Sequence, residues 1–146
     1  MDRDYSYVQV SLRDDLVQDV YSQLIEVGVA PNDKYDLHTT IMFDDRDLPE
    51  PLCELEPGKE FVAKINGMGK LGDAYVFHLY SPQLHEAFTK LTEAGYEHSY
   101  GTPMWHLSLA YKLDDFQYLA IDQAFAHWMG REIVLRNMAF GFKKNK

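Results

Sequence analysis

The chain has 146 residues, 46% of them hydrophobic and 25% charged, which fits a single globular domain over residues 1–146. Its formal net charge of -9 argues against a general binder of long nucleic acids, because phosphate backbones select basic surfaces; a small anionic ligand needs only a local positive charge. The N-terminus lacks the apolar core of a signal peptide, and no segment approaches the ~18 apolar residues of a membrane span. The single Cys53 has no partner for an internal disulfide. We therefore expect a cytoplasmic protein without a membrane partner.

The first half of the chain predicts a strand, a helix and a second strand. Residues 5–12 carry apolar side chains at every second position, which is the strand period. A helix follows from Asp14, a residue suited to the N-cap, and ends at Gly28; its apolar stripe consists of Leu16, Val20, Leu24 and Val27. After a loop, residues 35–43 form a strand that carries His38.

The second half repeats this order. Residues 74–80 are predicted to form a strand, and Ser81 and Pro82 the N-cap and first position of a helix that ends at Gly95. The apolar stripe of this helix consists of Leu84, Phe88 and Leu91. A loop then leads to a strand that carries His106.

The remaining segments complete the order of elements. They are a proline-rich acidic connection at 44–58, a strand at 60–68, a third helix at 114–129 and a closing strand at 131–142. This order favours an α+β fold with antiparallel or mixed sheets. We expect one domain of two pseudo-symmetric strand–helix–strand lobes, 1–58 and 59–146, around a central groove, with exchange of a terminal strand between the lobes left open.

Two of the predicted strands share a histidine followed two positions later by a hydroxyl residue: His38 and Thr40 in HTTI, and His106 and Ser108 in HLSL. The strand period places each histidine and its hydroxyl on one face, opposite Leu37, Thr39, Ile41 and Phe43 in the first strand and Trp105, Leu107 and Leu109 in the second. One such tripeptide is a weak motif, and a lone strand histidine is usually structural or solvated. The matching positions of the two motifs in similar halves favour a shared functional groove.

Paired imidazoles and hydroxyls suit the cleavage of a phosphodiester by a neighbouring 2′-hydroxyl. This reaction needs one group that removes a proton and another that donates one to the leaving oxygen, and histidine does either near neutral pH. Hydroxyls one pleat away can hydrogen-bond the phosphate oxygens as negative charge develops on them.

The two motifs resemble those of the 2H phosphoesterase superfamily, whose members carry paired His-x-Ser/Thr-apolar signatures on strands of a two-lobed fold. The resemblance implies that His38 and His106 form the acid–base pair and that Thr40 and Ser108 bind the phosphate; Ser108 stands where many members have threonine. It also implies a reaction without metal or cofactor, in keeping with a sequence that shows no clear set of metal ligands.

Within that superfamily, the short length, the acidic charge and the sequence DLHTTIMFD look most like phage anti-CBASS enzymes, which degrade the cyclic oligonucleotide signals of bacterial immunity. The implied ligand is a cyclic di- or trinucleotide, and the implied location is the host bacterial cytoplasm. Two alternatives stay open: an enzyme acting on RNA ends or 2′,5′-oligoadenylate, and a sponge that binds cyclic nucleotides without cleaving them. The base preference, the assignment of acid and base, and the oligomeric state also stay open.

Three further residues are candidates for substrate binding. Tyr5 and Tyr7 share the expected groove face of the first strand, where a tyrosine is either an ordinary strand aromatic or a platform for a base. Lys70 lies in NGMGKLGDAY, which is expected to be a hairpin loop that could also bring the lysine over a phosphate. The run FDDRD at 43–47 is expected to be a solvated turn, and His98 a loop histidine.

Overall fold

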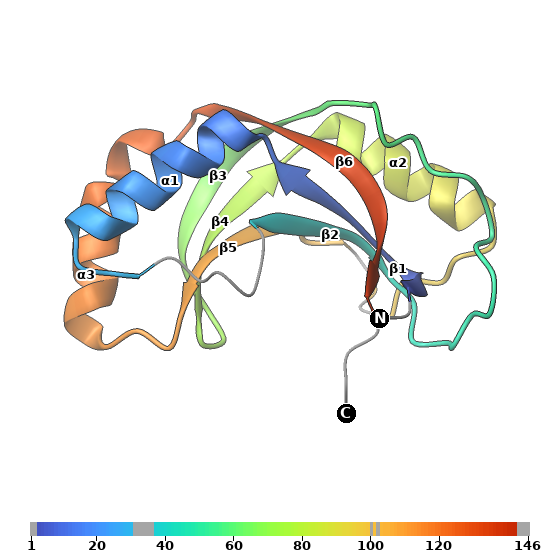
Figure 1. Ribbon diagram of the computed structural model, residues 1–146, viewed down its shortest axis with the longest axis horizontal. Coiled ribbons are helices and arrows are strands. Elements are labelled where there is room, and N and C mark those ends of the chain that lie inside the picture. The colour runs from blue at the N-terminus through green and yellow to red at the C-terminus, as the bar shows by residue number, and fades with distance from the viewer. Residues whose placement is uncertain (1–2, 31–36, 100, 102, 143–146) are drawn as a thin grey trace.

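The computed structural model describes residues 3–30, 37–99, 101 and 103–142, so the predicted loop at 31–36 lies outside the described residues. Strands and helices follow the predicted order (Figure 1). They are β1 (Arg3–Leu12), α1 (Asp14–Glu26), β2 (His38–Phe43), β3 (Phe61–Leu71), β4 (Ala74–Tyr80), α2 (Pro82–Glu93), β5 (His106–Tyr111), α3 (Asp115–Ala124), the short 3-10 helix η1 (Ala126–Trp128) and β6 (Glu132–Phe142). The predicted α+β class is confirmed.

All six strands form one sheet in the order β2-β1-β6-β3-β4-β5, and every neighbouring pair is antiparallel. The order is symmetric about its centre, because the strands that carry the histidine motifs, β2 and β5, form the two edges. The strands that precede α1 and α2 lie next to those edges. The C-terminal β6 lies in the middle, between β1 and β3.

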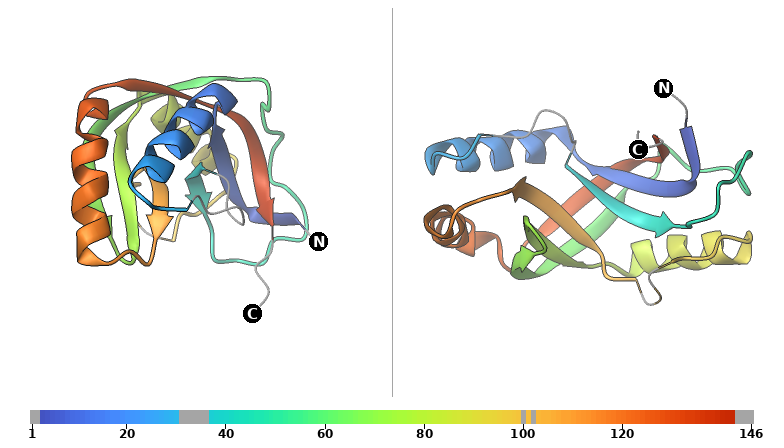
Figure 2. Two further views of the ribbon diagram at one scale, coloured as in Figure 1. Left: turned by 60° about the vertical axis from the view of Figure 1, so that its left-hand side comes forward. Right: turned by 90° about the horizontal axis from the view of Figure 1, so that it is seen from below.

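The sheet is strongly curved, and the helices lie in two groups at opposite ends of the long axis (Figures 1 and 2). Helices α1 and α3 lie side by side at one end, and α2 lies at the other. The curvature brings the two edge strands, β2 and β5, into contact range of each other. Residues far apart in the sequence therefore face one another across the concave side.

Local sequence signals fix most of the helix ends. The Ser81 hydroxyl accepts a hydrogen bond from the Leu84 amide at 3.1 Å and caps α2, with Pro82 at its first position, as predicted. Gly28 and Gly95 follow α1 and α2 with φ of +77° and +114°, a backbone conformation that glycine adopts without strain. Asp14, predicted as the N-cap, is instead the first residue of α1.

Two elements differ in extent from the prediction. The third helix ends at Ala124 rather than Met129, because the chain tightens into η1 and buries Trp128. The glycine-rich segment is strand up to Leu71, and only Gly72 and Asp73 form the turn of the β3–β4 hairpin. Among the described residues, no helix is long and apolar enough to cross a membrane.

Candidate functional site

The two histidine motifs occupy equivalent places on the two edge strands. His38 and His106 are each the first residue of their strand, and each histidine and its hydroxyl partner are half-buried. The residues between them, Thr39 and Leu107, are fully buried on the opposite, helix-covered face. The strand period thus directs all four candidate groups, His38, Thr40, His106 and Ser108, away from the core.

Both edge strands contain a β-bulge at the same position of the motif. In β2, Thr40 pairs with Gln9 and Met42 with Val8, so Ile41 is the extra residue. In β5, Ser108 pairs with Val76 and Ala110 with Tyr75, so Leu109 is the extra residue. Each bulge buries two consecutive side chains, Ile41 with Met42 and Leu109 with Ala110.

The bulges add an aromatic residue to the histidine face of each strand. The prediction placed Phe43 opposite His38, which is wrong, because the extra residue Ile41 shifts the alternation by one position. Phe43 instead pairs with Tyr7, and their rings meet edge to face at 6.0 Å between centroids. Tyr111, which the sequence did not single out, reaches the histidine face of β5 in the same way.

Tyr7 joins His38 and Thr40 into one hydrogen-bonded group. Its hydroxyl lies 2.6 Å from the Thr40 hydroxyl and 3.1 Å from Nε2 of His38. Burial raises the pKa of Tyr7; the Thr40 hydrogen bond opposes this shift, and the nearby Tyr111 and Asp4 add to it. Strands β2 and β5 are in contact, so the two motifs lie near each other.

His106 is oriented by a backbone carbonyl just before its own strand. Its Nδ1 lies 3.2 Å from the carbonyl oxygen of Met104, which only accepts hydrogen bonds, so Nδ1 carries the proton of this bond. In the neutral ring, Nε2 is then the atom that accepts a proton. This tautomer is the one a general base needs, because its lone pair is on the ring nitrogen away from the backbone.

A third histidine lies on the same face as His106. His78 of β4 pairs directly with His106, and paired residues of neighbouring strands share a face. A Cβ at Gly67, on the next strand, would come within 3.3 Å of the Cβ and Cδ2 atoms of His78, so glycine leaves this ring its space. His78 lacks the His-x-Ser/Thr pattern, and only the strand register identifies its position.

Lys70 lies on the other side of the sheet from the histidines. A bulge at Asn66 shifts the alternation of β3, so that Lys70 pairs with Tyr75, whose hydroxyl donates to Asp122 of α3 at 2.8 Å. The ammonium group of Lys70 lies 5.1 Å from the centre of the Tyr118 ring. The structure therefore does not bring Lys70 to the two motifs.

Tyr5 also has a partner within the sheet. Its ring packs edge to face against Phe140 of β6, with 5.3 Å between the centroids. The ring is half-buried, so part of it is accessible, and its role in binding a base stays a prediction.

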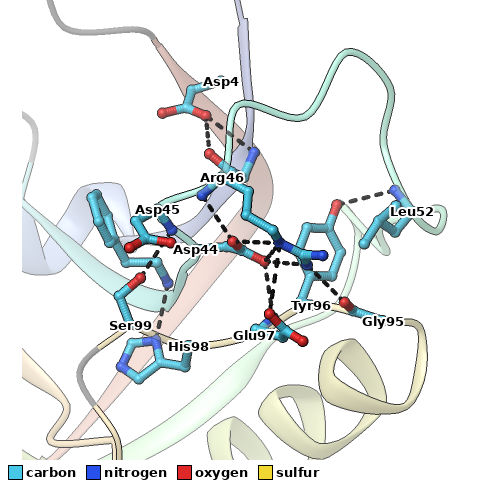
Figure 3. Close-up of polar contacts among 12 residues, drawn as sticks. Asp4, Asp44, Asp45, Arg46, Leu52, Gly95, Tyr96, Glu97, His98 and Ser99 are labelled. Carbon is cyan, nitrogen blue, oxygen red and sulfur yellow. Dashed lines mark hydrogen bonds and ion pairs between the residues drawn. The ribbon is translucent and has the colours of Figure 1, made fainter.

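Within the run at 43–47, residues 45–47 are exposed, as expected of a solvated turn, but Asp44 is buried and anchors the run (Figure 3). The Asp44 side chain is fully buried and accepts hydrogen bonds from the Arg46 guanidinium, at 2.6 Å for the shortest, and from the Glu97 amide at 2.9 Å. Arg46 also donates to the Gly95 carbonyl, and the Phe43 amide donates to Nδ1 of His98. These bonds tie the end of β2 to the segment that leads from α2 to β5.

Comparison with known proteins adds a family to this geometry. A family model described as "Anti-CBASS protein Acb1" matches residues 5–136, which include all four candidate groups and Tyr7. None of the curated proteins compared with the chain matches it significantly.

Proposed function

The chain belongs to the anti-CBASS protein Acb1 family, and we propose that it cleaves the 3′,5′ bonds of cyclic di- or trinucleotide immune signals in the cytoplasm of an infected bacterium. The observation that supports this most is the pair of half-buried histidines on two edge strands in contact, each with a hydroxyl one pleat away. That arrangement has the residue types and pattern of the 2H phosphoesterase motifs, and we assign the fold to that superfamily.

In the proposed reaction, the 2′-hydroxyl of a bound nucleotide attacks the adjacent phosphorus. One histidine removes the proton from this hydroxyl, and the other gives a proton to the 5′ oxygen as its bond to phosphorus breaks. The product of the first cut is one linear nucleotide, with a 5′-hydroxyl at one end and a 2′,3′-cyclic phosphate at the other. Thr40 and Ser108 stabilise the charge that develops on the non-bridging oxygens.

The decisive experiment offers the purified protein a panel of 3′,5′-cyclic di- and trinucleotides, 2′,5′-oligoadenylate and short RNA, and separates the products by chromatography. We expect cleavage of a cyclic nucleotide and formation of a 2′,3′-cyclic phosphate end. Cleavage of 2′,5′-oligoadenylate or RNA ends alone would overturn the proposed substrate. Recovery of intact ligand after denaturing the protein would instead identify a sponge.

A further inference from the structure

From the contacts around His38 we infer that Tyr7 is a positioning residue, whose hydroxyl fixes the orientation of the His38 imidazole relative to the Thr40 hydroxyl. We also infer that residue 141 is glycine because any side chain there would displace the Tyr7 ring. This inference rests on the proposed function, because it gives Tyr7 a part in the same reaction. It goes further by giving Tyr7 a role other than that of a stacking platform for a base.

The hydroxyl of Tyr7 is the shared partner of both groups in the first motif. It lies 2.6 Å from the Thr40 hydroxyl and 3.1 Å from Nε2 of His38. An imidazole on an edge strand has rotational freedom about its side-chain bonds, and a fixed partner at one ring nitrogen removes part of that freedom. Burial raises the pKa of Tyr7, so the hydroxyl keeps its proton near neutral pH.

The ring of Tyr7 is held in place by its neighbours on both sides. The Phe43 ring meets it edge to face from β2. On β6, a Cβ at Gly141 would lie 2.2 Å from Cδ1 and 2.8 Å from Cε1 of Tyr7, which no real contact allows. The ring therefore rests directly on the backbone of Gly141, and any larger residue there would displace it.

Among the described residues, the second motif has no equivalent of Tyr7. In the first motif, Phe43 pairs with Tyr7. Tyr111 is the counterpart of Phe43 in β5, and it pairs with Ala74, which has no hydroxyl. His106 is held instead by the Met104 carbonyl, two residues earlier in the chain. The two histidines thus have different surroundings, and only the first depends on a side chain from another strand among these contacts.

The test uses the full-length protein with Tyr7→Phe, which keeps the ring and removes only the hydroxyl. We expect kcat on the best cyclic dinucleotide to fall ~10-fold or more with KM changed less than about twofold, as for a misplaced catalytic group. The Nε2 resonance of His38 in ¹⁵N NMR should shift, while that of His106 stays as an internal control. This NMR measurement needs no turnover, so it tests the contact even if the protein cleaves none of the nucleotides and the proposed function fails.

Gly141→Ala tests the seat of the ring. We expect it to lower kcat at least as much as Tyr7→Phe, but to have no further effect in a Tyr7→Ala background, where no ring remains to be displaced. Gly58→Ala is the matched control, because nothing lies within 4 Å of a Cβ at Gly58. Unchanged kcat in Tyr7→Phe, a rise in KM alone, or an unshifted His38 resonance would each overturn the inference.

Discussion

Thr39 and Thr40 are neighbours in the chain that face opposite sides of the sheet. The Thr40 hydroxyl lies 2.6 Å from that of Tyr7 on the histidine face. The Thr39 side chain is fully buried, and its hydroxyl has no hydrogen-bond partner among the described residues. Valine has nearly the shape of threonine but lacks the hydroxyl. Substituting valine at each of the two positions therefore compares the loss of a hydroxyl on the histidine face with the loss of a buried one.

We predict that Thr40→Val lowers turnover by ~10²-fold, the scale of losing one donor to a developing oxyanion. Thr39→Val should leave turnover unchanged and raise the free energy of unfolding by ~1 kcal/mol, because it removes an unsatisfied buried hydroxyl. Steady-state kinetics and urea unfolding measure the two effects. Equal losses of activity in both variants would show that the hydroxyl of Thr40 has no special role.

The two histidines should behave as one unit. His38→Ala and His106→Ala are each expected to reduce turnover by ~10²-fold or more, the usual scale of lost acid–base catalysis. The double variant should lose far less than the product of the two losses, since each histidine needs the other for a complete reaction. His127→Ala, at an exposed position of η1, serves as the control. A folded single variant with near wild-type activity would contradict the two-histidine mechanism.

At the scale of the elements, local patterns predicted the fold well because helix ends depend on local chemistry. The cap of α2 by Ser81 and the stop at Gly95 are signals within a few residues. Bulges are different, because they depend on pairing with a neighbouring strand. The extra residues Ile41 and Leu109 move Phe43 and Tyr111 to the histidine face, and the bulge at Asn66 moves Lys70 away from it.

The period of two therefore failed wherever a bulge intervened. The sequence did contain an indication of the two bulges, because both motifs continue with two apolar residues and then an aromatic residue: HTTIMF and HLSLAY. A regular strand would have buried that aromatic residue. The hydrogen bonds of Tyr7, in contrast, depend on a contact between β1 and β2 that no local pattern encodes.

The Asp44 anchor gives the fold a defined dependence on acid. The hydrogen bonds from Arg46, followed by those of the Glu97 and Arg46 amides, lower the pKa of Asp44 from its ordinary 3.8 to about 2, against the opposing effect of burial. Because the folded protein binds this proton more weakly than the unfolded chain, the stabilisation is complete above pH ~4 and is lost as the pH falls toward 2. A shift of this size corresponds to about 2 kcal/mol.

We predict that Asp44→Asn lowers the free energy of unfolding at pH 7 by about 2 kcal/mol or more and flattens its pH dependence between pH 4 and 2. Urea unfolding at several pH values measures both effects. Asp45→Asn is the control, because Asp45 is exposed. An Asp44→Asn protein as stable as the wild type would show that this anchor is not needed to hold the end of β2.

At the scale of the whole molecule, the curvature of the sheet brings the two histidine motifs together. The motif strands are the two edges of a six-stranded sheet, and a flat sheet would hold them five strands apart. The contact between β2 and β5 closes that gap. The first half supplies Tyr7 and Thr40 to the site, and the second half supplies His106 with its own backbone support.

We predict that the activity does not depend on a metal ion. Within 3–30, 37–99 and 103–142, no three His, Cys, Asp or Glu residues are grouped so that they could hold one. Two histidines can supply both proton transfers without a Lewis acid. Turnover should persist in excess chelator and should not rise when Mg²⁺, Mn²⁺ or Zn²⁺ is added back. Loss on chelation with recovery by one ion would assign the protein to a different mechanistic class.

Net charge sets the size of substrate that the whole molecule tolerates. With a net charge of -9, the surface repels every phosphate that lies outside the site, so long RNA should bind poorly. On the histidine face, Arg136 pairs with Ser11, which in turn pairs with His38, but the Arg136 guanidinium lies 3.2 Å from the Asp14 carboxylate, so this positive charge is already paired. A compact cyclic nucleotide places few phosphates beyond the site.

We therefore predict that cyclic ribodinucleotides are cleaved far faster than RNA oligomers of any length, with a preference that weakens as salt screens the repulsion.

Tyr5→Ala should weaken binding more than turnover if its half-buried ring stacks on a base, at a cost of ~1–3 kcal/mol. A cyclic dinucleotide that lacks the attacking 2′-hydroxyl should bind with similar affinity and stay intact, because the nucleophile is part of the substrate. Calorimetry measures the binding and chromatography the cleavage. Cleavage of the deoxy analogue would mean that water attacks the phosphorus directly, and the histidine that now removes a proton from the 2′-hydroxyl would then have to activate water.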